Sequence, residues 1–140
     1  GFYPDSISSD LHVQSMNAAM MDMPTTMSKC LAMGMPVTEV ISRATAVPAR
    51  MIGHPELGHL SPGAPADIAL WNLREGAFGF KDSVGGRMRG SRRFECEMTL
   101  RDGEIVWDLN ARDAAEYGDL PENAGIREGE FLIPPIKMSQ

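Results

Sequence analysis

The chain has 140 residues, of which 43% are hydrophobic and 23% are charged, and this composition excludes a chain that is disordered throughout. Its 13 Lys and Arg against 19 Asp and Glu give a formal net charge of −6, so we expect no nucleic-acid partner. No apolar run reaches the ~18 residues of a membrane-spanning helix, so we expect no membrane partner either.

The first part of the chain predicts a loop followed by a helix. Residues 1–24 open with Pro4 and a serine-rich stretch, which are typical of turns. A helix is predicted to begin at Thr25 or Thr26, and Gly34 is suited to end it, because glycine adopts a left-handed conformation at little cost. Its apolar face would carry Met27, Cys30 and Leu31.

Two shorter helical segments are predicted next. Pro36 fits the first turn of a second helix, where its missing N–H is not needed. The apolar stripe of this helix would consist of Val37, Val40, Ile41 and Ala44. A third, very short helical turn is predicted over Pro48–Ile52, closed by Gly53.

Strands are predicted in the second half. Ile68–Trp71 and Phe78–Phe80 each suggest a short strand. Phe94–Arg101 alternates strictly between apolar and polar residues, which predicts a strand with one buried face. Asp102-Gly103 is a favoured hairpin turn, and Glu104–Trp107 would return as the partner strand. The outward face would carry Glu95, Glu97, Thr99 and Arg101.

Two smaller features have ordinary interpretations. Four arginines lie within Arg87–Arg93, and we favour a solvated loop over an anion site, although both remain open. The two cysteines, Cys30 and Cys96, are far apart, so we interpret them as small apolar fillers in a protein of the reducing cytoplasm.

The candidate chemical groups are few. Asp10 and His12 are two residues apart, so they could share a metal or a substrate, or Asp10 could simply cap its own loop. His54 and His59 flank a proline and a glycine, and we interpret both as solvated loop residues. The residues alone therefore do not make a complete active site.

Four segments, in order, resemble one family. Pro4–His12 resembles the segment around the last barrel strand of the metal-dependent amidohydrolases, and is most similar to the amidohydrolase/deacetylase branch, near the dihydroorotases and adenine deaminases. Ala44–Arg50 resembles the family's "T-x-N-P-A" turn, with Val47 where asparagine is common. Gly58–Ile68 resembles its "G-x-L-x-P-G-x-x-A-D" segment, and Arg101–Val106 its closing hairpin.

The resemblance implies an α+β fragment of a larger fold. The family is a (β/α)₈ TIM barrel with an appended small β-sandwich, and its active site lies at the carboxyl ends of the barrel strands. Residues 1–57 would be the end of the barrel domain, with its last strand, loop and helices. Residues 58–110 would be the C-terminal share of the β-sandwich, and residues 111–140 an extended C-terminal tail.

The resemblance also implies a function for the parent enzyme. It would be a hydrolase acting on amide, N-acyl or related ester bonds of a small-molecule substrate through a metal-activated water. Asp10 would be the catalytic carboxylate and one ligand of a divalent metal, expected to be zinc, and His12 could contact substrate. The family's remaining ligands belong to earlier strands, so we expect the 140 residues alone to bind no metal and to be inactive.

Two alternatives remain open, namely a non-catalytic interaction chain and one half of a split amidohydrolase. In a fragment of the barrel, several apolar residues would lack the barrel strands that cover them in the parent. We therefore expect self-association or pairing with the N-terminal part. The residues concerned are Met20, Met21, Leu31, Val40 and Ile41.

Overall fold

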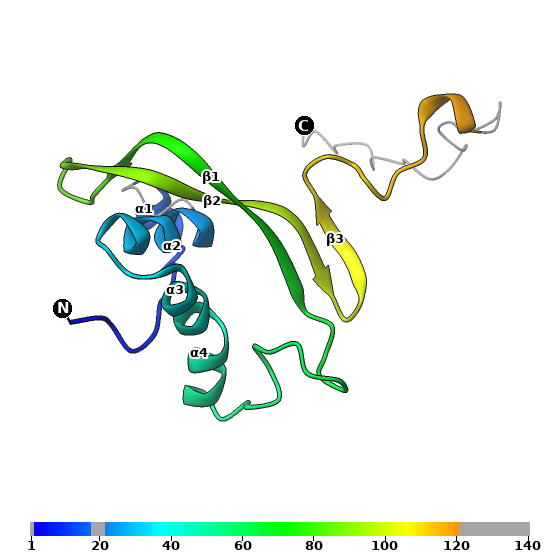
Figure 1. The fold of residues 1–140 in the computed structure, drawn as a ribbon, viewed down its shortest axis with the longest axis horizontal. Coiled ribbons are helices and arrows are strands. Elements are labelled where there is room, and N and C mark those ends of the chain that lie inside the picture. Colours follow the sequence, from blue (N-terminus) through cyan, green and yellow to red (C-terminus); the bar gives the residue numbers. More distant parts are fainter. Residues whose placement is uncertain (1, 18–21, 121–140) are drawn as a thin grey trace, which may run out of the picture.

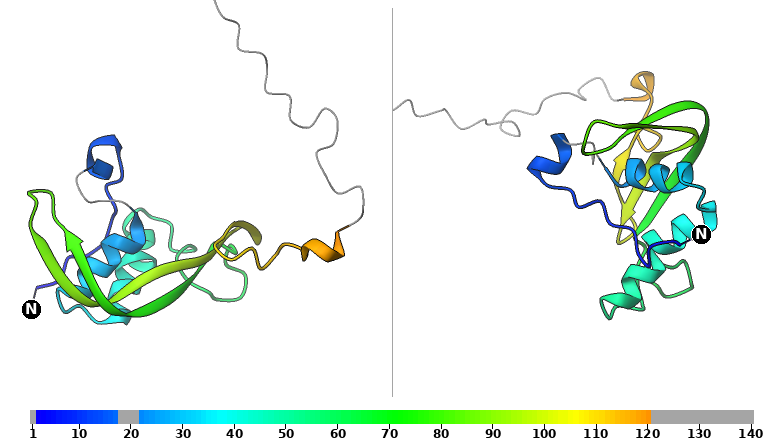
Figure 2. Two further views of the ribbon diagram at one scale, coloured as in Figure 1. Left: turned by 90° about the horizontal axis from the view of Figure 1, so that it is seen from above. Right: turned by 90° about the vertical axis from the view of Figure 1, so that its left-hand side faces the viewer.

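A computed structural model describes residues 2–17 and 22–120, which form an α+β structure (Figure 1). In chain order the elements are α1 (Val13–Asn17), α2 (Met23–Ala32), α3 (Val37–Ala44), α4 (Ala46–Met51), β1 (Ile68–Lys81), β2 (Arg87–Arg101), β3 (Glu104–Asp108) and the 3₁₀ helix η1 (Tyr117–Asp119). Figure 2 shows the long β1–β2 ribbon bent, with the helices on its concave side. Within the described ranges, no helix is both long and apolar enough to cross a bilayer.

Helix α2 confirms the predicted helix and begins two residues before Thr25. The reason is Asp22, whose Oδ1 accepts a hydrogen bond of 2.7 Å from the backbone N of Thr25 and so caps the first turn. Gly34, with φ of +94°, ends the helix as expected. Helix α3 is confirmed, with Pro36 as its N-cap and not in its first turn, whereas α4 begins at Ala46, two residues before the predicted start at Pro48.

The three strands form one antiparallel sheet in the order β1-β2-β3. The hairpin at Asp102-Gly103 is confirmed, and both turn residues have positive φ, which a tight turn of this type requires. The two short strands predicted at Ile68–Trp71 and Phe78–Phe80 are parts of the single strand β1. Pairing with β2 runs from Ile68↔Leu100 to Lys81↔Arg87 and holds β1 together, with register shifts between Leu70 and Trp71 and between Glu75 and Phe78.

A β-bulge overturns part of the predicted alternation. Leu70 pairs with Met98 and Trp71 pairs with Cys96, so Glu97 is one extra residue in β2. Because a bulge shifts the side-chain alternation, Glu97 lies inside with only 4% of its surface exposed, instead of on the outward face.

The core joins the helices to the sheet. Val40 has no exposed surface, and Phe94 of β2 packs edge-to-face on Trp71 with ring centroids 6.0 Å apart. The buried apolar cluster comprises Ile7, Met27, Cys30, Leu31, Met35, Val40 and Phe94. Burial raises the pKa of the Cys30 thiol, which is consistent with its expected role as an apolar filler.

Helix α2 covers the edge of β2 that faces away from β1. The Ser28 hydroxyl accepts a hydrogen bond of 2.9 Å from the backbone N of Phe94 and donates one of 2.6 Å to the carbonyl oxygen of Pro24. Ser28 has 0% exposed surface. A single buried hydroxyl therefore replaces the neighbouring strand that would otherwise bond to this part of β2.

The structure corrects two expectations about exposed surface. Leu31 and Val40 are buried within the chain itself, because α2 packs on both β2 and α3, whereas Ile41 is 40% exposed. Met20 and Met21 lie outside the described residues. The arginines of Arg87–Arg93 lie on strand β2 and not in a loop, since pairing with β1 extends to Lys81↔Arg87.

The segment after β3 is exposed from Leu109 to Leu120, and η1 is its only helix within the described part of the chain. In Figure 1 it runs away from the helices, and residues 121–140 of the expected tail lie outside the described residues. The domain boundaries at 57 and 110 stay predictions, although the core cluster combines helices before residue 57 with Phe94 after it.

Candidate functional site

Asp10 and His12 lie on a surface turn that leads into α1. Their side chains are exposed, 81% for Asp10 and 53% for His12, and 3.9 Å separates Asp10 Oδ2 from His12 Nε2. Asp10 has a φ of +48°, in the left-handed region that aspartate and asparagine tolerate better than most residues. The turn therefore presents the carboxylate and the imidazole side by side at the surface.

Ser15 holds this turn in shape. Its hydroxyl accepts a hydrogen bond of 2.8 Å from the backbone N of His12 and donates one of 2.6 Å to the carbonyl oxygen of Asp10. Ser15 itself is only 8% exposed. Ser15 was not among the candidate residues in the sequence, although its position three residues after His12 is that of a side chain that caps a helix by bonding back to the backbone N of the N-cap residue.

The His12 ring has a defined orientation. Its Nδ1 accepts a hydrogen bond of 3.3 Å from the backbone N of Gln14, so the neutral ring carries its proton on Nε2. The Nε2 atom faces the Asp10 carboxylate. In this arrangement His12 donates a proton at Nε2, which suits contact with a substrate oxygen better than ligation of a metal.

The turn supplies too few ligands for a metal. Over residues 2–17 and 22–120, no group of three His, Cys, Asp or Glu side chains is placed to hold a metal ion. Asp10 offers carboxylate oxygens, which hard divalent cations accept, but one carboxylate gives no complete coordination sphere. These residues alone therefore do not fit a catalytic metal.

The strand expected to lead to Asp10 is not formed, since residues 2–12 contain no helix or strand. The segment is instead held by α3, because the backbone N of Ile7 bonds to Arg43 O at 2.8 Å and Arg43 Nη1 bonds to Pro4 O at 2.6 Å. A barrel strand needs a neighbouring strand on each side, and the three described strands pair among themselves.

The two other histidines are exposed loop residues, as expected. His54 Nδ1 lies 2.8 Å from Glu56 Oε1, and this hydrogen bond holds the pKa of Glu56 below its ordinary value. His59 Nδ1 accepts a hydrogen bond of 3.2 Å from the backbone N of Ser61.

The other family-like segments have structural roles in the connection between α4 and β1. Gly58, with φ of +74°, lies so close to the Thr45 backbone that a Cβ atom would come within 2.7 Å of it. Asp67 Oδ1 accepts a hydrogen bond of 2.8 Å from the backbone N of Asp102, at the hairpin turn. These contacts fix the backbone between α4 and the hairpin.

Comparison with known proteins decides the family. The model of the amidohydrolase family matches residues 2–106, about three quarters of the chain. The chain belongs to the amidohydrolase family. Within it, a deacetylase of Brucella anthropi is 41% identical over 106 residues, which are 76% of this chain and 26% of that protein. The deacetylase Atu3266 of Agrobacterium fabrum is 39% identical over the same shares of both chains.

Solved amidohydrolase-like structures agree with this assignment. A dihydroorotase matches 75% of this chain and 28% of its own with a TM-score of 0.68 and 35% identity. An adenine deaminase matches 74% of this chain and 28% of its own with a TM-score of 0.70 and 27% identity. The chain thus spans about a quarter of the length of the relatives it matches, and these amidohydrolase neighbours confirm the resemblance found in the sequence.

Proposed function

We propose that this amidohydrolase chain supplies the catalytic carboxylate of a metal-dependent hydrolase that cleaves amide or N-acyl bonds of a small molecule. The observation that carries the proposal is the Asp10 turn, which lies inside the family match and exposes a carboxylate beside an imidazole. The deacetylase relatives favour acetyl as the acyl group that is removed.

Asp10 would act by transferring a proton. As a carboxylate, it can accept the proton of the attacking water at one oxygen and later give it to the leaving nitrogen. A divalent metal, expected to be zinc, would supply hydroxide near neutral pH when bound, because it lowers the pKa of water to about 7. Its other ligands must come from residues outside those described here. His12, with its proton on Nε2, would donate to a substrate oxygen.

A hybrid enzyme tests the role of Asp10. The matching 106-residue segment of the Brucella anthropi deacetylase would be exchanged for this chain's own segment, and hydrolysis of an N-acetylated small molecule would be measured. Asp10→Asn keeps the size and the positive φ of the residue while removing its charge. We expect it to lower kcat at least ~10²-fold, the scale of acid–base catalysis.

The matched control is Asp5→Asn, since Asp5 is also exposed and lies in the same segment. It should leave kcat within twofold of the hybrid's value. Equal activity of the Asp10→Asn and parent hybrids would contradict the proposed role. Zinc bound stoichiometrically by the isolated chain would contradict our expectation that the site needs ligands from elsewhere.

A further inference from the structure

A buried carboxylate lies where the sheet irregularity brings it inside. Glu97 is the extra residue of the β2 bulge and is 4% exposed. Such a group is tolerated in the interior only when hydrogen-bond donors surround it. Three donors do so here, namely Asn72 Nδ2 at 2.6 Å, Asn110 Nδ2 at 2.6 Å and Arg112 Nη2 at 2.8 Å.

These donors come from two separate parts of the chain. Asn72 belongs to β1, whereas Asn110 and Arg112 belong to the segment Leu109–Asp113 that follows β3, here named the strap. The backbone N of Leu109 also bonds to the carbonyl oxygen of Glu97 at 2.9 Å. Glu97 therefore contacts the strap through its side chain and its backbone.

The strap has a second, local support at Asp108. The Asp108 carboxylate accepts hydrogen bonds from the backbone N of Asn110 at 3.1 Å and of Asp113 at 3.0 Å. Although desolvation acts to raise the pKa of Asp108, these backbone donors hold it below its ordinary value. Asp108 shapes the strap as a turn, but it does not bind the strap to β1 or to the bulge of β2.

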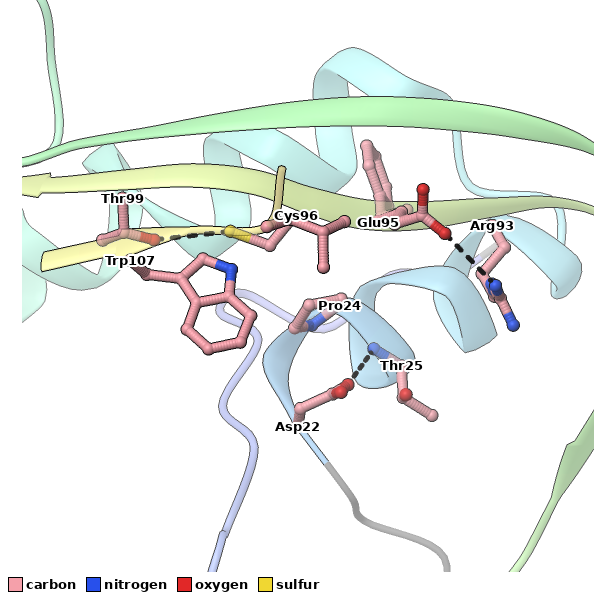
Figure 3. A pocket seen from close by; sticks show the side chains of 10 residues that line it. Asp22, Pro24, Thr25, Arg93, Glu95, Cys96, Thr99 and Trp107 are labelled. Carbon is pink, nitrogen blue, oxygen red and sulfur yellow. Dashed lines mark hydrogen bonds and ion pairs between the residues drawn. The ribbon is translucent and has the colours of Figure 1, made fainter. Parts of the chain in front are cut away.

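The strap also forms part of a pocket of about 580 Å³ (Figure 3). Its lining includes Leu109 of the strap, Cys96 and Trp107 of the sheet, and Asp22 and Pro24 at the start of α2. Leu109 is 44% exposed and the strap residues after it are exposed, so apolar burial contributes little to holding the strap in place.

We propose that Glu97 is the clasp that holds the strap on the sheet, and that its release frees the strap and opens the pocket while the hairpin stays folded. The hairpin survives because the β1–β2 and β2–β3 ladders do not depend on the Glu97 carboxylate. The strap can therefore leave the sheet when one buried side chain, that of Glu97, loses its contacts.

Amide hydrogen exchange measured by NMR on the whole chain tests release of the strap. Glu97→Gln keeps the side-chain size but turns one acceptor oxygen into an NH₂ group that faces donors. We expect the Leu109 amide to exchange at least ~10-fold faster, since each lost bond to a charged group weakens the strap. The Phe94 amide, which bonds to Ser28, should change by less than twofold.

Alkylation by iodoacetamide, followed by mass spectrometry, tests the pocket. In Glu97→Gln, Cys96 should react several-fold faster because Leu109, which lines the same pocket, is released with the strap, and buried Cys30 should keep its rate. Glu104→Gln removes an exposed glutamate from the same hairpin and should change neither cysteine nor the Leu109 amide.

A second variant tests release of the strap if Glu97→Gln fails to fold. Asn110→Ala removes one bond from the strap itself and leaves the Asn72–Glu97 bond intact. It should accelerate exchange at Leu109 about fivefold. An unchanged exchange rate of the Leu109 amide in the folded variant would contradict the role of Glu97. Equal acceleration at Phe94 and Leu109 would contradict it as well.

Discussion

The junction between the helices and β2 differs from the Asp10 turn in what holds it. At the junction, Ser28 of α2 bonds to Phe94 of β2, and both residues are buried among side chains from distant parts of the chain. At the turn, Asp10 and His12 are exposed, and Ser15, only three to five residues away, makes the bonds that hold them.

The core is therefore complete within the described residues, whereas the candidate site is not. The described residues cover most of the apolar side chains that the helices and β2 present to each other. The same residues do not complete a metal site around Asp10. In this amidohydrolase chain, folding and chemistry therefore depend on different sets of residues, and substitutions should affect them separately.

The largest effect should come from the core. Leu31→Ala removes a side chain that is 6% exposed, and we expect it to lower the free energy of unfolding by about 3 kcal/mol through lost burial and a cavity. Urea denaturation measures this, with Leu60→Ala as control, because Leu60 is 77% exposed. Equal destabilisation by both variants would break the comparison.

The junction bond should come next. Ser28→Ala leaves the buried Phe94 N–H without its acceptor, which should cost about 2 kcal/mol. The control is Ser61→Ala, an exposed serine in the loop before β1, for which less than ~0.5 kcal/mol is expected. A loss at Ser28 as small as that at Ser61 would show that α2 does not need this bond to cover β2.

A smaller and local effect is expected at the turn. Ser15→Ala removes the hydroxyl that joins the backbones of Asp10 and His12, at a cost of about 1 kcal/mol. The His12 amide should exchange about fivefold faster, while the Phe94 amide keeps its rate. If the Phe94 amide accelerates as well, the turn is coupled to the core and the two regions are not independent.

The smallest effect should be that of the proposed catalytic carboxylate on stability. Because the Asp10 side chain is 81% exposed, Asp10→Asn should change the free energy of unfolding by less than ~0.5 kcal/mol in urea denaturation. A neutral effect here, together with lost activity in the hybrid enzyme, would sharpen the distinction between core and site. A large loss of stability would assign Asp10 a structural role.

Local signals predicted much of the fold. Gly34 and Pro36 placed the helix ends, and Asp102-Gly103 placed the hairpin, because these residues act on the backbone next to them. The long β1 was divided in the prediction, since its glycines indicate a break unless the opposite strand is known. Gly79 and Gly90 lie where an added Cβ would meet Arg87 and Phe80, respectively, from across the ribbon.

Features that depend on distant residues could not be predicted in this way. The bulge that buries Glu97 depends on the register with β1, and the role of Ser28 depends on a strand 66 positions later. For the site, the sequence indicated Asp10 and His12 through family resemblance. Ser15 was detectable from its spacing, but only once α1 was known to begin after His12.

The bond between Ser28 and Phe94 also constrains the order of events during synthesis. Helix α2 is made 66 residues before the strand that covers it. At roughly 5–20 residues per second, Phe94 follows about 3–13 s later. During that interval Met27 and Leu31 have no sheet to pack against, so the nascent helix presents an apolar face to the ribosome surface and to chaperones.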